Sequence, residues 1–153
     1  MSYSKDPMLL RSIIMDHYDT PSKRIDVNSE HACLHHYQNK SSTCIDDITA
    51  YVNIENDVIT EVYFSGLGCA VSTASTDIMC NWLVGKTPAQ AMEIIDNYVS
   101  MTLGQPYNEE LLDELIAFYN INNQSNRIKC SQIGVNAIKT CIQEVLANGQ
   151  ATK

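Results

Sequence analysis

G-L-G-C-A-V-S-T-A-S, residues 66–75, separates a segment with strand character from a segment with helical character. Residues 58–64 before it are rich in β-branched and aromatic side chains, whereas apolar residues from Val71 onward recur every three or four positions. Cys69 is therefore predicted at or near the first turn of a helix. There, unpaired N–H groups and the helix dipole favour thiolate over thiol. Such a thiolate can serve as a metal ligand or as a nucleophile.

Two further cysteines have a similar setting. Cys44 lies in T-C-I-D before a strand-like run, and Asp46, two residues on, points to the same side of an extended chain. Cys130 lies in R-I-K-C-S, directly before a helical run. With Cys69, these residues make three thiols and one carboxylate, the number of ligands that a closed tetrahedral zinc site requires. Asp47 leaves the identity of the acidic ligand open.

The spacing alone also allows a second interpretation of these residues, in which they are scattered thiols and a surface acid. The chain contains no C-x-x-C pair to favour the metal site directly. Wide spacing does not exclude it, because closing the 60-residue loop between Cys69 and Cys130 costs roughly 3–4 kcal/mol of chain entropy. A structural zinc returns on the order of 10 kcal/mol or more.

The remaining cysteines and histidines are expected to be structural. Cys80 and Cys141 fall inside helical runs, so we predict that they pack in the core. His31, Cys33 and His35 alternate along a predicted strand, and we favour a solvated strand face over a second metal site.

Two further charged groups are assigned to helix surfaces. His17 is expected at the end of the first helix, where the helix dipole favours a positive charge. The acidic residues between 109 and 114 are interpreted as a solvated helix face.

Length and composition limit the class of protein. A chain of 153 residues is expected to be a single domain with its own core, and a net charge of −8 disfavours nucleic acid and anionic membranes as partners. The N-terminal residues M-S-Y-S-K-D-P contain no apolar signal segment, and no run is long enough to span a membrane. Six cysteines without an export signal indicate metal or redox chemistry, so we expect a cytoplasmic protein.

The predicted fold class is α+β, with a three-stranded antiparallel sheet and helices packed on one of its faces. Strands come first in the sequence and most helices follow, and Asn56-Asp57 is a hairpin turn signal. The expected strands are residues 31–37, 48–54 and 58–64. The expected helices are residues 7–18, 70–84, 88–103, one that Asn108 caps, and 131–148.

Four stretches resemble the U-type iron–sulfur assembly proteins, the family of IscU, SufU and the N-terminal part of NifU. They are I-I-M-D-H-Y-D-T-P near the start, T-C-I-D, G-L-G-C-A-V-S-T-A-S and R-I-K-C-S, and they span nearly the whole chain in the family's order. G-x-G-C-x-x-S is the most specific of the family's motifs. The long segment between Cys69 and Cys130, and Lys129 where the scaffold branch usually has His, resemble the SufU branch.

The resemblance implies an IscU/SufU-like fold with zinc bound by Cys44, Asp46, Cys69 and Cys130. It implies a cysteine desulfurase and downstream iron–sulfur assembly proteins as partners. In the SufU branch the residue that Cys44 matches accepts sulfur as a persulfide, a sulfurtransferase-type role. In the IscU branch the same ligands hold a nascent [2Fe–2S] cluster.

The chain departs from the family pattern at Ile45, which stands where the family usually has glycine. A β-branched residue there disfavours a turn with positive φ, and this bears on how easily the Cys44 loop moves. Sulfur acceptance is the favoured function, because a charged lysine at position 129 cannot act as a spare ligand as histidine can. Cluster scaffolding and a purely structural zinc module that binds a partner are the alternatives.

Overall fold

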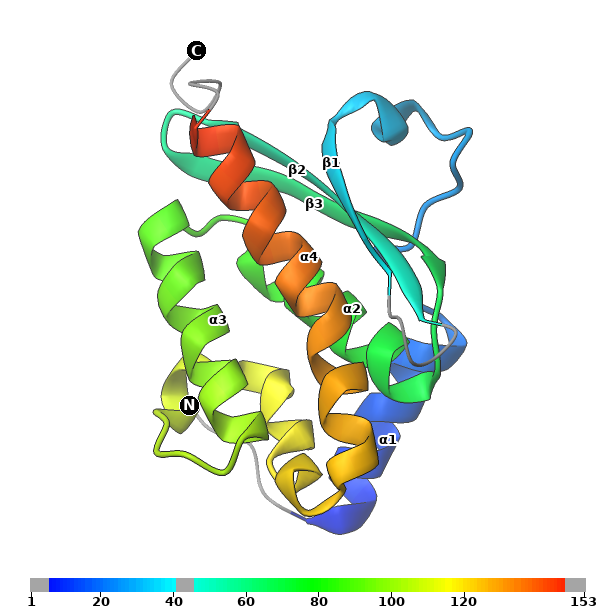
Figure 1. The fold of residues 1–153 in the computed structure, drawn as a ribbon, viewed down its shortest axis with the longest axis vertical. Coiled ribbons are helices and arrows are strands. Elements are labelled where there is room, and N and C mark those ends of the chain that lie inside the picture. The colour runs from blue at the N-terminus through cyan, green and yellow to red at the C-terminus, as the bar shows by residue number, and fades with distance from the viewer. Residues whose placement is uncertain (1–5, 41–45, 148–153) are drawn as a thin grey trace.

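A three-stranded antiparallel sheet and the helices that cover one of its faces form two layers (Figure 1). The strands are β1 (His35–Lys40), β2 (Asp47–Glu55) and β3 (Val58–Leu67), and they lie in the sheet in that order. This computed structural model describes residues 6–40 and 46–147. The predicted α+β class is confirmed.

The β2–β3 hairpin forms where the sequence predicts it. Alternate residues of β2 from Ile48 to Ile54 are buried against the helices, as the period of two requires. Asn56 and Asp57 join the strands with φ values of 54° and 63°. Positive φ at both central residues is what a type I′ turn needs, and its twist matches that of the strands.

Gly66 allows β2 and β3 to pair up to the start of β2. Its φ is 111°, and a Cβ at this position would lie 2.0 Å from the carbonyl oxygen of Asp47. No other residue fits there without moving the strands apart. The pairing therefore extends β3 to Leu67, three residues beyond the predicted end, and brings the start of β2 close to the start of the next helix.

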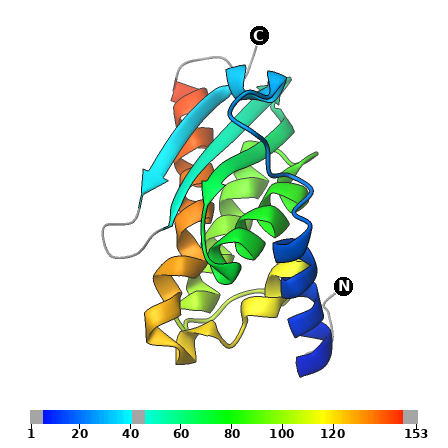
Figure 2. The same ribbon diagram turned by 90° about the vertical axis from the view of Figure 1, so that its right-hand side faces the viewer.

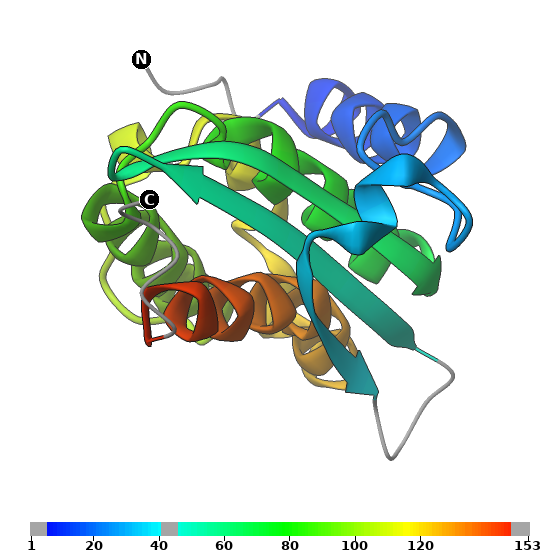
Figure 3. The same cartoon turned by 90° about the horizontal axis from the view of Figure 1, so that it is seen from above.

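Four α-helices form the second layer: α1 (Pro7–Asp19), α2 (Ala70–Leu83), α3 (Pro88–Thr102) and α4 (Ile128–Ala147). α4 packs on β1, β2 and α2, while α2 packs on β3 and α1 (Figure 3). α3 begins with the predicted cap, where Thr87 and Gln90 form a reciprocal capping box. The helices lie on one face of the sheet, as predicted.

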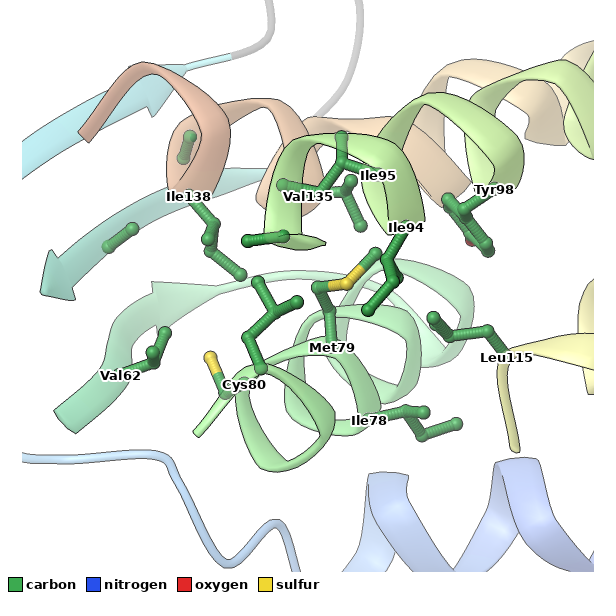
Figure 4. Packing of buried hydrophobic residues seen from close by; sticks show 14 of the residues in the cluster. Val62, Ile78, Met79, Cys80, Ile94, Ile95, Tyr98, Leu115, Val135 and Ile138 are labelled. Atoms are coloured by element: carbon green, nitrogen blue, oxygen red, sulfur yellow. The ribbon is translucent and has the colours of Figure 1, made fainter. Parts of the chain in front are cut away.

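The core lies between the sheet and the helices. Figure 4 shows Met79 of α2 and Ile94 of α3 pointing toward each other, with Val135 and Ile138 of α4 above them. Cys80 and Cys141 are fully buried, so their prediction as core residues is confirmed. Truncating a residue such as Ile138 to alanine would cost about 2–5 kcal/mol of stability.

The first predicted strand, residues 31–37, is confirmed over residues 35–37 and wrong before them, and the helix predicted after Asn108 is wrong. Residues 31–33 belong to a 3₁₀-helix, η1 (Glu30–Cys33), so His31 and Cys33 do not alternate with His35 along a strand. The helix expected after Asn108 is a series of short 3₁₀ turns. These are η2 (Glu109–Leu111), η3 (Asp113–Phe118), η4 (Ile121–Asn123) and η5 (Ser125–Arg127). Asn108 does cap the first of them, because its side chain accepts a hydrogen bond from the Glu110 N–H.

His17 joins three elements that are distant in sequence. Its Nδ1 lies 2.5 Å from Oδ2 of Asp77 in α2, and its Nε2 lies 2.8 Å from Oε1 of Glu114 in η3. Asp77 is fully buried and also accepts a hydrogen bond from the Lys23 N–H. Glu114 is therefore not part of a solvated helix face, and His17 does more than complement the dipole of α1.

The hydrogen bond to Asp77 raises the pKa of His17 above its ordinary value, outweighing burial, which lowers it; the bond to Glu114 adds to the increase. A raised pKa in the folded state means that protonated His17 stabilises the fold. This stabilisation is complete below the ordinary pKa of about 6.5 and is lost as the pH rises through the folded-state pKa.

We predict that replacing His17 by glutamine destabilises the protein at pH 6 by about 3 kcal/mol, the effect of removing one partner of a buried charge pair. The free energy of unfolding, measured in urea between pH 6 and pH 9, should fall with pH more steeply in the wild type than in the variant. His36→Gln, at an exposed position, is the control and should follow the wild type. Equal pH dependence of wild type and His17→Gln would contradict the assignment.

Candidate metal centre

Asp46 lies directly before β2 and is 1% exposed. Its Oδ1 accepts a hydrogen bond of 2.9 Å from the backbone N–H of Cys69. Its Oδ2 is buried and has no hydrogen-bond partner among the residues that the structure describes. An unpaired buried carboxylate oxygen is costly, and a bound cation is one group that satisfies it.

Cys69 is the N-cap residue of α2, which confirms its prediction at a helix start. Its backbone is extended (φ −71°, ψ 177°), and its side chain makes no capping hydrogen bond, so the thiol is available to a ligand. Gly68 before it is needed for close packing, since a Cβ there would lie 2.2 Å from Oγ of Ser72. The helix start therefore fixes the Cys69 backbone without engaging its sulfur.

Cys130 lies inside α4 as its third residue, not directly before the helix as predicted. η5 ends at Arg127 and α4 begins at Ile128, so the 3₁₀ turn continues into the helix. Cys130 is thus held in the first helical turn, where the backbone conformation is fixed. Its side chain is partly buried.

The ligand atoms of Asp46, Cys69 and Cys130 lie within 4.8 Å of one another. Donor atoms on a zinc tetrahedron with ordinary bond lengths are roughly 3.3–3.8 Å apart, so only a small contraction is required. Two thiols and one carboxylate are a donor set that suits zinc. Cys44, the fourth predicted ligand, and Ile45 beside it lie outside the described residues.

The structure distinguishes Asp46 from Asp47, which the sequence leaves open. Asp47 is the first residue of β2, and its Oδ1 accepts a hydrogen bond from the side chain of Gln38 on β1. Asp46 is the carboxylate that lies with the two thiols. Within residues 6–40 and 46–147, this is the single group of three or more histidine, cysteine or acidic side chains close enough to share an ion.

Burial raises the pKa of the Cys130 thiol to about 12, and the neighbouring Cys69 and Asp46 add to the increase. The expectation that a helix N-terminus favours the thiolate therefore fails at Cys130. Loss of hydration and neighbouring negative charge outweigh the dipole. A divalent cation supplies the positive charge that this cluster lacks and would deprotonate a coordinating thiol.

Among the described residues, Cys33, Cys80 and Cys141 have no companion ligands. Cys33 is exposed on η1, and its thiol donates to the carbonyl oxygen of Glu30. Cys80 and Cys141 are buried among apolar side chains, and burial raises the pKa of both thiols. None of the three lies in the cluster of Asp46, Cys69 and Cys130.

Residues 10–150 match the model of the NifU-like N-terminal domain. The chain belongs to this family. The family resemblance seen in the four sequence stretches is thereby confirmed.

Individual relatives agree with the family match. The iron–sulfur cluster assembly scaffold protein IscU of Streptococcus pyogenes serotype M1 is 33% identical over 98% of this chain and 92% of its own length. The zinc-dependent sulfurtransferase SufU of Bacillus subtilis strain 168 is 26% identical over 86% of this chain and 87% of its own.

Solved structures show the same fold. FiSufU, an iron–sulfur cluster assembly scaffold protein for the SUF system from Fervidobacterium islandicum AW-1, superposes with a TM-score of 0.75. It is 30% identical in sequence, and the match covers 92% of this chain and 96% of that one. Among the helices of residues 6–40 and 46–147, none has the length and apolar character needed to cross a membrane.

We predict that Cys69→Ser and Cys130→Ser each abolish stoichiometric zinc binding and lower the melting temperature, because each removes a ligand from a rigid backbone position. Asp46→Ala should weaken zinc binding by at least tenfold. Asp47→Ala is the matched control and should keep one zinc per chain. Metal content by mass spectrometry and affinity by competition with a chelator test this set. Full zinc content in both serine variants would falsify the site.

We also predict that Cys33, Cys80 and Cys141 are dispensable for metal binding. A Cys33→Ser, Cys80→Ala, Cys141→Ala variant should bind one zinc per chain, although the two core changes lower its stability. Metal analysis and circular dichroism of the same sample provide the measurement. Halved metal content with an intact fold would reveal a second site.

Proposed function

We propose that this protein acts in iron–sulfur cluster assembly as a zinc-bound acceptor of persulfide sulfur from a cysteine desulfurase. The observation that carries the proposal is the cluster of Asp46, Cys69 and Cys130, with one carboxylate oxygen buried and unpaired. The names of the SufU and IscU relatives support it. We further propose that the chain works as one domain, in the cytoplasm, and passes sulfur to downstream assembly proteins.

Zinc, when bound, would hold the cysteine ligands as thiolates and link the segment before β2 to the starts of α2 and α4. Cys44, Asp46, Cys69 and Cys130 are the four residues that we propose as its ligands. Three of these come together in the structure. The fourth, Cys44, is assigned from the sequence.

Cys44 is the proposed sulfur acceptor because the other two thiols are fixed. Cys69 is the N-cap residue of α2 and Cys130 lies in the first turn of α4, so neither backbone can move toward a partner without unwinding a helix. Cys44 follows the polar residues K-S-S-T in the sequence. In the proposed step, the Cys44 thiolate attacks the outer sulfur of a persulfide on the desulfurase. The persulfide S–S bond breaks, the donor cysteine leaves as a thiolate, and Cys44 becomes the persulfide.

Cluster scaffolding is the second candidate. The relative from S. pyogenes is named a scaffold, and a thiolate-rich site can also hold iron–sulfur clusters. Lys129 disfavours cluster scaffolding as the main function. The residue before Cys130 is exposed, and a charged lysine cannot replace a lost ligand.

Protein purified without oxygen separates the two candidates. Colourless protein with one zinc per chain is expected for sulfur acceptance. A brown chromophore that disappears in Cys69→Ser and Cys130→Ser would instead support scaffolding as the main function. Absorption spectra and metal analysis of the same preparation provide the readout.

We predict that sulfur is added to Cys44 when the zinc-loaded protein is incubated with a cysteine desulfurase and free cysteine. Peptide mass spectrometry should find the added sulfur on Cys44 and at most a tenth as much on Cys69 or Cys130. Cys33→Ser serves as the control and should leave labelling of Cys44 unchanged. Sulfur chiefly on Cys69 or Cys130 would contradict the assignment. No sulfur on any cysteine, with a bound desulfurase, would support a structural zinc module instead.

A further inference from the structure

A groove runs between α1 and the segment of residues 117–127. It consists of two cavities of about 540 and 270 Å³ that share four lining residues, Arg11, Ile14, Ala117 and Asn120. In Figure 2 the yellow turns of η3 lie beside the blue helix α1, and the two elements are in contact. We refer to the two cavities together as the α1 groove.

The floor of the α1 groove is apolar and its rim is basic. Val71, Phe118 and Ile121 are buried side chains that line the larger cavity. Arg11 and Arg127, both exposed, line the same cavity. Among the described residues, neither guanidinium has a hydrogen-bond or ion-pair partner.

The charge of the groove is opposite to that of the protein. The chain carries 18 acidic residues and a net charge of −8, yet no aspartate or glutamate lines either cavity. Arginine presents a rigid set of donors that binds carboxylates in a bidentate manner, and it is more weakly hydrated than lysine. Two unpaired arginines above an apolar floor therefore favour an occupant with carboxylates and an apolar side chain.

Two residues that line the larger cavity are close in sequence to ligands of the candidate metal centre. Val71 is two residues after Cys69, and Arg127 is three residues before Cys130. A segment bound in the groove would thus contact residues that are two and three positions from Cys69 and Cys130.

We infer that the α1 groove docks a short acidic segment of a partner protein, with one apolar side chain over Phe118 and carboxylates on Arg11 and Arg127. A second copy of this chain brings a net charge of −8, whereas a short acidic segment brings only the few carboxylates that the two arginines can pair with. Two arginines are too few for a nucleic-acid surface, which relies on neutralising many phosphates. The inference does not depend on whether the metal centre accepts sulfur.

The test selects peptides from a phage-displayed library of random nine-residue sequences against the intact zinc-loaded protein. Enriched peptides should contain two or more acidic residues around an aliphatic or aromatic residue. Binding of the best synthetic peptide, measured by fluorescence anisotropy, should weaken at least tenfold in Arg11→Ala/Arg127→Ala. Lys40→Ala/Lys139→Ala removes the same charge outside the groove, from exposed Lys40 and from half-buried Lys139, which pairs with Asp96. This control should bind the peptide within twofold of the wild type.

Several results would overturn the inference. Selected peptides without acidic residues, or equal losses of affinity in both double variants, would show that the groove does not recognise an acidic segment. If changing the apolar residue of the peptide to alanine leaves its affinity unchanged, binding rests on charge attraction alone and the apolar floor plays no part in it. A dimer in sedimentation equilibrium that is lost in Arg11→Ala/Arg127→Ala would make a second copy the occupant.

Discussion

The hydrogen bond from the Cys69 N–H to the Asp46 carboxylate joins the sheet layer to the helix layer at the candidate metal centre. It engages one carboxylate oxygen and leaves the other buried without a partner among the described residues. The bond holds the carboxylate in place and leaves its second oxygen available to a cation. Carboxylates that bind metals are commonly held by such hydrogen bonds, which fix their orientation.

Close backbone packing around this bond brings the ligands together. Gly66 lets β3 pair with the first residue of β2, which places Asp46 next to the start of α2. Gly134, one turn after Cys130, lies against Thr76 of α2, where a Cβ would come within 1.7 Å of the Thr76 hydroxyl. α4 can therefore approach α2 closely, and this approach carries Cys130 to Cys69. The two glycines determine the geometry of the centre although neither is a ligand.

Local patterns in the sequence predicted the elements that depend on local chemistry. The β2–β3 hairpin followed from alternation and the Asn56-Asp57 turn, and the capped start of α3 followed from Thr87 and Pro88. Contacts between residues far apart in the sequence could not be predicted from such local patterns. The contact of His17 with Asp77 and Glu114 spans 60 and 97 positions, and no spacing rule connects them. The 3₁₀ turns after Asn108 keep the apolar residues of a helix, so periodicity alone could not distinguish them.

At the candidate site, the types of residue indicated a zinc site, but their positions in the sequence did not identify every ligand. Thiols and acids indicated zinc, but the choice of Asp46 over Asp47 required the alternation of β2 and its pairing with β1 and β3. The start of α4 before Cys130 depends on η5 continuing into it, and no capping residue marks that boundary in the sequence. This earlier start matters for function, because it fixes the Cys130 backbone in a helical turn. Asp46 and Cys69 are joined by a hydrogen bond, and the backbone of Cys130 is held in α4. This is why we propose Cys44, and not Cys69 or Cys130, as the thiol that leaves a bound zinc to accept sulfur.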